Sequence, residues 1–189
     1  MFVEPSRAGI KKGWIEVISG CMFSGKTEEL IRRLRRVQIS GQQAEIFKPL
    51  VDVRYDPTDI VSHGQARIRS TPVENSYKIH LLATDVDVVG IDEAQFFDDG
   101  IVDVVEDMAS NGVRVIVAGL DKDFTGKPFG PIPALLAKAE YITKLHAVCV
   151  RCGDTASYSY RKSKIEDMVL LGEKDTYEPR CRSCFYHLP

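Results

Sequence analysis

The stretch "GCMFSGKT" at residues 20–27 constrains the fold more than any other part of the sequence. It fits the pattern G-x-x-x-x-G-K-[ST], in which a glycine-rich loop between a strand and a helix cradles phosphate groups. The run before it, "WIEVIS" at 14–19, is apolar and partly β-branched and predicts a buried strand. The run after it, "TEELIRRLRRVQIS" at 27–40, repeats apolar residues at helical spacing. This context favours a phosphate-binding loop over a glycine turn with a surface lysine.

The residues of such a loop, a P-loop, have separate roles. Backbone N–H groups point inward and the helix contributes its positive end, so that a triphosphate is bound. Lys26 is expected to reach the β- and γ-phosphates, and the hydroxyl of Thr27 is expected to bind Mg²⁺. Glycine at positions 20 and 25 allows close approach of the backbone. The expected ATP-binding residues of the loop are Gly20, Cys21, Met22, Phe23, Ser24, Gly25, Lys26 and Thr27.

A second motif supplies the carboxylate that a P-loop enzyme needs for its metal ion. In "VVGIDEAQFF" at 88–97, an apolar strand ends in Asp92, and Glu93 follows directly. Asp92 is expected to bind Mg²⁺ through water, because Mg²⁺ dehydrates reluctantly. Glu93 projects differently and is positioned to take a proton from an attacking hydroxyl or water. The alternative is a pair of acids that only ends a strand.

Further segments alternate between strand-like and helix-like patterns. Apolar runs predict strands at 44–49, 86–92, 113–120 and 141–148. Helices are predicted near 75–83, 99–110 and 131–139. Near-continuous apolar strands between helices indicate an α/β fold, with a mostly parallel sheet and helices on both faces. The stretch at 50–74, rich in Pro, Asp and Arg, is expected to be a mobile loop that contains one short strand.

Four of the five cysteines form two C-x-x-C pairs, Cys149 with Cys152 and Cys181 with Cys184. The 28 residues between the pairs are enough for a hairpin or a long loop. Such pairs bring four thiolates around one Zn²⁺, and a shell filled by sulfur leaves no open position, so the zinc is expected to be structural. The alternatives are chance pairing of buried thiols, or His187 as a ligand. Cys21, the odd cysteine, is expected to pack rather than to bind metal.

The overall composition is that of a soluble folded protein without a charge bias. Of 189 residues, 44% are hydrophobic and 28% are charged, and the formal net charge is -2 with a pI near 6.1. These values give no global electrostatic reason to expect nucleic-acid binding. The basic run "RRLRR" at 32–36 falls on a predicted helix and is expected to be a solvated face or a subunit contact.

The chain is expected to be cytoplasmic and to make no membrane contact. Its first residues lack the apolar segment of a signal peptide, and nowhere do 18 apolar residues follow one another. Cysteines in a reducing compartment favour metal binding over disulfides. The change in composition near residue 149 predicts three parts, which are a flexible N-terminus at 1–12, a P-loop α/β domain at 13–148 and a small zinc-binding unit at 149–189.

Several motifs occur together and in a specific order. They are "SGCMFSGKT", "FKPLVDVRY", "SHG", "GIDEAQFF", "GLDKDFTGKPFG" and "LLGEKDTYEPRC", the last of these between the cysteine pairs. Together they resemble the type II thymidine kinases, the cytosolic human-type family that also occurs widely in bacteria. The resemblance covers about residues 13–185, which is nearly the whole chain.

The resemblance implies a RecA-like P-loop fold that transfers the γ-phosphoryl group of ATP to the 5′-hydroxyl of thymidine, with deoxyuridine as a weaker acceptor. It also implies a homotetramer, one structural zinc per subunit and feedback inhibition by dTTP. Glu93 matches the general base, and Arg54 matches an arginine near the phosphates. A lasso loop of the zinc unit, at about 163–179, is expected to close over the nucleoside. The residues that match the thymidine pocket are Met22, Phe96, Leu120, Phe124, Phe129, Leu170, Gly172 and Tyr177.

Two other functions use the same motifs. A P-loop ATPase with a zinc ribbon that moves a nucleic-acid strand predicts a basic groove, which the acidic pI argues against. A nucleotide sensor without turnover has no need for a base, so Glu93 beside Asp92 argues against it.

Overall fold

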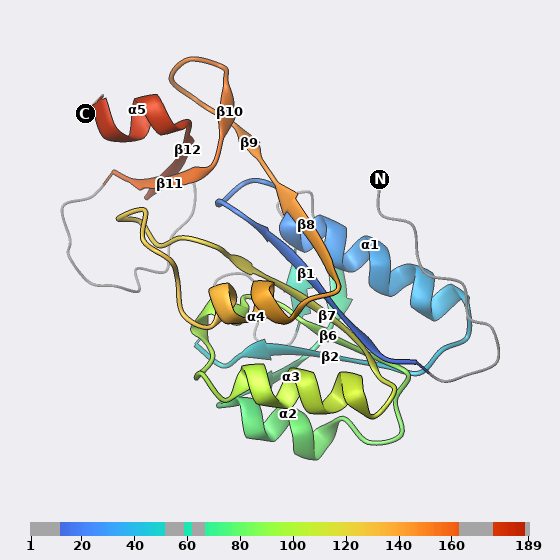
Figure 1. Cartoon of the computed structure of the whole chain (residues 1–189). Helices are drawn as coiled ribbons and strands as arrows, with labels where there is room; N and C mark the ends of the chain where they lie inside the picture. Colours follow the sequence, from blue (N-terminus) through green and yellow to red (C-terminus); the bar gives the residue numbers. More distant parts are fainter. Residues whose placement is uncertain (1–11, 52–58, 62–66, 163–175, 188–189) are drawn as a thin grey trace.

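The structure is a computed structural model, and it describes residues 12–51, 59–61, 67–162 and 176–187. Its largest element is a six-stranded sheet in the order β5-β2-β6-β7-β1-β8, in which every neighbouring pair is parallel (Figure 1). The strands are β1 (Trp14–Gly20), β2 (Ala44–Pro49), β5 (Thr71–Val73), β6 (Val88–Ile91), β7 (Arg114–Leu120) and β8 (Tyr141–Leu145). The predicted α/β fold with a mostly parallel sheet is thereby confirmed.

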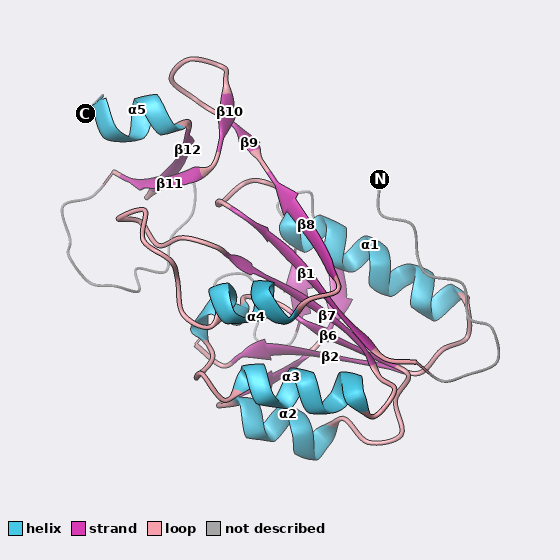
Figure 2. Cartoon of the chain, viewed as in Figure 1, coloured by secondary structure: helices cyan, strands magenta, loops and turns pink. Residues whose placement is uncertain are grey.

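Helices cover both faces of this sheet, as predicted (Figure 2). α1 (Lys26–Ile39) packs on one face, and α2 (Ser76–Leu82), α3 (Ile101–Ser110) and α4 (Ile132–Lys138) pack on the other. Successive strand residues point to opposite faces, so Ile116 joins the core beneath α1, whereas Val115 and Val117 join the core on the other side. Among the described residues, no helix is long and apolar enough to cross a bilayer.

The basic run at 32–36 does not form a single solvated face. Its other three arginines are exposed, but Arg33 is fully buried. The Arg33 guanidinium donates to Glu16 at 2.7 Å and to Glu29 at 2.7 Å, and Glu16 also accepts from Arg114 at 2.6 Å. Glu16 lies fully buried in β1, where an ionised carboxylate needs cationic partners. The expectation of a solvated face is therefore wrong for Arg33.

The stretch at 50–74 contains more regular structure than the sequence predicts. β3 (Asp59–Val61) and β4 (Arg67–Arg69) form an antiparallel pair, and β5 adds a parallel strand beside β2. Ile60 and Ile68 are buried in the core on the α1 side, which explains why this polar stretch folds against the sheet. The expectation of one short strand is therefore corrected to three in the described part of this stretch.

The predicted strand at 141–148 is two strands that belong to different sheets. β8 pairs with β1 at the edge of the main sheet, whereas β9 (Ala147–Val148) pairs antiparallel with β10 (Thr155–Ala156). β11 (Tyr158–Arg161) and β12 (Tyr177–Arg180) form another antiparallel pair, followed by α5 (Arg182–His187). These elements lie beyond the carboxyl end of β8 (Figure 1), so the edge strand leads directly into the cysteine-bearing part of the chain.

Candidate active site

The two predicted motifs meet at the carboxyl edge of the main sheet. The loop at 20–27 follows β1, and Asp92 and Glu93 follow β6. β7 lies between these two strands and is followed by Asp121. Because all three strands are parallel, their carboxyl ends lie along the same edge, where open α/β sheets bind ligands.

The loop at 20–27 has the backbone shape of an anion cradle. Phe23 and Gly25 have positive φ angles of 64° and 87°, and α1 begins directly afterwards at Lys26. The N-cap residue of α1 is Gly25, which has no side chain to cap the helix, and a helix N-terminus of this kind suits an anion. The Lys26 ammonium donates to the carbonyl of Cys21 at 2.9 Å, and the Ser24 hydroxyl donates to the same carbonyl at 2.8 Å. The lysine is thus already held over the loop, in a place suited to phosphate oxygens.

The loop also packs against the C-terminal part of the chain. A Cβ on Gly20 would lie 2.3 Å from the carbonyl oxygen of Leu145 at the end of β8, so only glycine fits. The Met22 N–H donates to the hydroxyl of Ser159 at 3.0 Å. Cys21 is buried, and its thiol lies 3.4 Å from the Ala156 carbonyl. Burial raises the pKa of the Cys21 thiol, which keeps it protonated at neutral pH.

The acidic pair is held in a defined conformation. Asp92 is buried, and its carboxylate accepts from the N–H of Glu93 at 2.9 Å. Glu93 has a left-handed backbone with φ 49°, which is uncommon for a residue with a side chain. Its carboxylate accepts from the side-chain amide of Gln95 at 2.5 Å. Gln95 was not anticipated from the sequence, although a polar residue within the apolar run "AQFF" is a signal for a buried hydrogen bond.

Asp121, at the end of β7, adds a further buried carboxylate to this edge. Burial alone would raise its pKa, but hydrogen bonds from Lys144 and Lys122 outweigh this, and the pKa is lowered below its ordinary value. The ammonium groups lie 2.8 Å and 3.1 Å from the carboxylate, respectively. No sequence pattern marks these three residues as a cluster, because the two lysines come from different segments.

The described residues of the expected thymidine pocket include two aromatic contacts. Phe96 and Phe129 meet edge to face, with ring centroids 5.7 Å apart. The guanidinium of Arg161 lies 3.6 Å from the centre of the Phe124 ring and donates to the Tyr177 hydroxyl at 2.6 Å. Arg161, which the sequence did not mark, therefore joins Phe124 to Tyr177.

Leu120 is buried at the end of β7, and the three phenylalanines of the expected pocket are half-buried. Arg54, Leu170 and Gly172 lie outside the described residues, as do residues 163–175 of the lasso expected at about 163–179, whereas Tyr177 at its end lies in β12.

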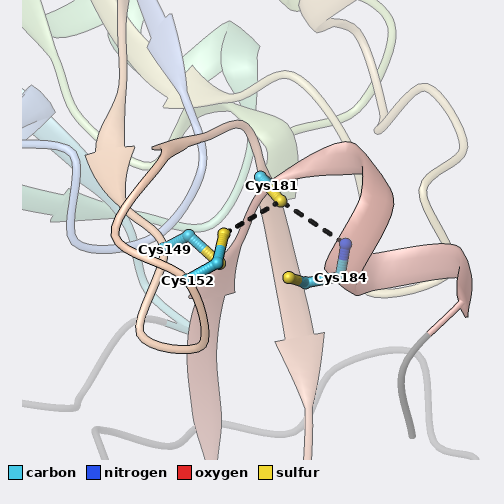
Figure 3. A group of neighbouring side chains, drawn as sticks. All are labelled: Cys149, Cys152, Cys181 and Cys184. Atoms are coloured by element: carbon cyan, nitrogen blue, oxygen red, sulfur yellow. Dashed lines mark hydrogen bonds between the residues drawn. The ribbon is translucent and has the colours of Figure 1, made fainter.

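The four paired cysteines converge as their spacing predicts (Figure 3). Their sulfur atoms all lie within 4.8 Å of one another, and those of Cys152 and Cys181 are 3.7 Å apart. Four sulfurs at the usual Zn–S distance of about 2.3 Å would be about 3.8 Å apart in a tetrahedron. The cluster therefore has the size and donor set of a four-thiolate zinc site. Among the described residues, neither Cys21 nor His187 belongs to it.

One cysteine of the cluster favours the thiolate even without a metal. Burial raises the pKa of Cys149, but backbone N–H groups, including that of Cys181, outweigh this effect and lower the pKa to about 6. In the same cluster, burial and hydrogen bonds with the neighbouring thiols raise the pKa of Cys184 to about 12, so a metal ion that binds all four thiolates would displace the Cys184 proton.

A phosphate-binding loop between β1 and α1, with an acidic pair two strands away on the same edge, defines a P-loop nucleotide-binding protein. The family model described as thymidine kinase matches residues 13–185. The chain is 60% identical to a thymidine kinase of Porphyromonas gingivalis (strain ATCC BAA-308 / W83), over 93% of this chain and 86% of that protein. It is 59% identical to one of Rhodothermus sp. (strain ITI 518), over 95% and 84%, and 57% identical to one of Bacteroides thetaiotaomicron, over 93% and 88%. The chain belongs to the thymidine kinase family.

Proposed function

We propose that this chain is an ATP-dependent thymidine kinase, which transfers the γ-phosphoryl group of ATP to the 5′-hydroxyl of thymidine and gives dTMP for pyrimidine deoxynucleotide salvage. The observation that carries this proposal is the placement of the loop at 20–27 and of Glu93 on one sheet edge. This placement occurs in a chain whose family match extends over residues 13–185.

The loop and α1 bind the triphosphate in this proposal. Backbone N–H groups of the loop surround the phosphates, apart from that of Met22, which Ser159 holds, and the Lys26 ammonium exchanges the Cys21 carbonyl for β- and γ-phosphate oxygens. Mg²⁺, when bound by the Thr27 hydroxyl and, through water, by Asp92, would neutralise charge on those oxygens. Arg54 is proposed to lie near the same phosphates.

Glu93 is the proposed general base. It accepts the proton of the 5′-hydroxyl as that oxygen attacks the γ-phosphorus, and the bond to the ADP oxygen breaks. The side chain is held by Gln95 at 2.5 Å and the backbone by its left-handed turn, so little reorganisation is required.

The nucleoside is proposed to lie among aromatic rings, of which three phenylalanines are half-buried and Tyr177 is buried. Phe96 and Phe129 offer one edge-to-face pair, and Phe124 and Tyr177 are joined by Arg161. Aromatic faces and edges suit a flat pyrimidine. Met22, Leu120, Leu170 and Gly172 complete the proposed pocket, and the segment at about 163–179 is proposed to close over it and exclude water.

The four cysteines are proposed to bind a structural Zn²⁺. A shell of four sulfurs leaves no open coordination position, so the ion would brace β9, β12 and α5 rather than take part in chemistry. The chain is further proposed to divide into a P-loop domain at 13–148 and a zinc unit at 149–189. A homotetramer, inhibition by dTTP and a cytoplasmic location are further parts of it.

A panel of nucleosides incubated with ATP, Mg²⁺ and the purified protein tests the function. Product from thymidine, weaker product from deoxyuridine and none from purine nucleosides is the expected result. ATP hydrolysis with and without single-stranded DNA, run alongside, tests the rival strand-moving ATPase. Hydrolysis stimulated by DNA, without any nucleoside product, would overturn the kinase proposal.

A further inference from the structure

Gln95 connects the proposed base to the strand beside the phosphate loop. It lies in the short 3₁₀ helix η1 (Ala94–Phe96), two residues after Glu93, and only 3% of it is exposed. Its Nε2 donates to Oε2 of Glu93 at 2.5 Å, and its Oε1 accepts from the N–H of Leu120 at 2.9 Å. Both ends of this buried amide therefore have protein partners.

These two contacts determine which way the amide faces. The Leu120 N–H can only donate, so it selects the carbonyl oxygen of Gln95. The NH₂ group must then face Glu93, whose ionised carboxylate can only accept. A flipped amide would place donor against donor and acceptor against acceptor. Strand β7, through Leu120, thus aims the donor that holds Glu93.

Two glycines make room for the Gln95 residue. A Cβ on Gly119 would lie 3.0 Å from Oε1 of Gln95, and a Cβ on Gly130 would lie 2.4 Å from its backbone oxygen. Close packing of this kind leaves a buried side chain few alternative rotamers. The Gln95 amide is therefore held by packing as well as by hydrogen bonds.

We propose that Gln95 is a positioning residue for phosphoryl transfer, which orients the Glu93 carboxylate toward the nucleoside 5′-hydroxyl and is itself anchored by the Leu120 N–H. This inference rests on the proposed thymidine kinase function. A misaligned base lowers the rate of the chemical step more than it lowers the affinity for substrate. The signature of the role is a loss in kcat with little change in KM.

Two variants separate the contact with Glu93 from the contact with Leu120. Gln95→Glu keeps an acceptor for Leu120 but replaces the donor with a second carboxylate, whereas Gln95→Met removes both contacts. Gln95→Glu is expected to lower kcat about tenfold or more, with KM for thymidine and ATP changed by less than about threefold. Gln95→Met is expected to lower kcat and also to raise KM for thymidine, since Leu120 loses its acceptor. If Gln95→Glu does not fold, Gln95→Met provides the test instead, and a wild-type kcat in that variant would overturn the positioning role.

A double variant shows whether Gln95 acts through Glu93. In a Glu93→Gln background the base is already lost, so Gln95→Glu is expected to reduce kcat no further. If the role of Gln95 is purely structural, the reductions in kcat from the two single substitutions are expected to multiply in the double variant. Val105→Ala, a buried change in α3, is the control for lost stability, and it is expected to lower the melting temperature without changing kcat.

The outcomes separate this inference from the proposed function. Thymidine phosphorylation by the wild type, together with a wild-type kcat in Gln95→Glu, would overturn the positioning role alone. Multiplied losses in the double variant would also overturn it. No phosphorylation by the wild-type protein would overturn the proposed function, and the positioning role with it.

Discussion

Met22 and Ser159 lie 137 residues apart in the chain, yet the backbone N–H of Met22 donates to the Ser159 hydroxyl at 3.0 Å. Met22 belongs to the phosphate loop, and Ser159 lies buried in β11. β11 pairs with β12, which leads directly into Cys181. The cysteine cluster is therefore connected to the phosphate loop through the β11–β12 pair and the Ser159–Met22 hydrogen bond.

Removing the Ser159 hydroxyl is expected to weaken ATP binding. Ser159→Ala leaves the Met22 N–H without this acceptor, and a neutral hydrogen bond contributes about 0.5–1.5 kcal/mol, so KM for ATP should rise about 2- to 10-fold. Steady-state kinetics at saturating thymidine measures the change. Ser159→Thr retains a hydroxyl and serves as the control. An unchanged KM in Ser159→Ala would show that this bond does not support the loop.

Neutralising the proposed base is expected to affect turnover and not binding. Glu93→Gln should lower kcat by about two orders of magnitude or more, in line with general-base contributions, while ATP and thymidine still bind. Rapid-quench or steady-state assays give kcat, and calorimetric titration gives the affinities. Wild-type turnover in Glu93→Gln would remove Glu93 from the mechanism.

Breaking the cysteine cluster is expected to release metal and to disturb the nucleoside site. Cys181 directly follows β12, which carries Tyr177, so Cys181→Ser should lower the zinc content and raise KM for thymidine together. Elemental analysis of the purified protein measures the zinc. Cys21→Ser, outside the cluster, should keep the wild-type metal content. Full activity in a zinc-free protein would contradict a structural role for the ion.

A buried ion-pair cluster and an exposed ion pair are expected to contribute differently to the free energy of unfolding. Glu16→Gln removes the carboxylate that buried Arg33 and Arg114 share, which leaves Arg33 only its pair with Glu29, and should lower the free energy of unfolding by about 3–5 kcal/mol. Lys138→Gln removes a pair with Glu106 in which both side chains are 46% exposed, and should cost less than about 1 kcal/mol. Urea unfolding measures both values. An equal decrease in unfolding free energy in both variants would mean that burial does not increase the contribution of the Glu16 ion pairs to stability.

Asp121 is expected to make stability depend on pH in the acid range. Its pKa is lowered in the folded state, so its contribution is fully present above the unfolded value of about 4 and is lost as the pH falls through the folded value. The wild type should therefore exceed Asp121→Asn in unfolding free energy most at pH 7, and the difference should shrink below about pH 4. A difference that stays constant from pH 7 to pH 3 would refute this assignment.

Features that depend on neighbouring residues could be predicted from the sequence. The loop at 20–27 and its flanking elements are continuous in the chain, so their pattern reports their structure directly. The C-x-x-C spacing likewise requires each cysteine pair to meet. By contrast, the stretch that holds three short strands at 59–73 reads as a loop with a single short strand. The reason is that strands of so few residues carry little periodicity.

The sequence alone therefore determined the loop at 20–27 between its strand and helix, the acidic pair at the end of β6 and the four-cysteine cluster, since each depends on local spacing. Only the tertiary structure decided that Gln95 lies between Glu93 and Leu120, that Arg33 is buried against Glu16 and that Ser159 meets Met22. The physical reason is that buried hydrogen bonds and ion pairs form wherever packing brings complementary groups together. No local pattern in the chain records which distant residue that partner is.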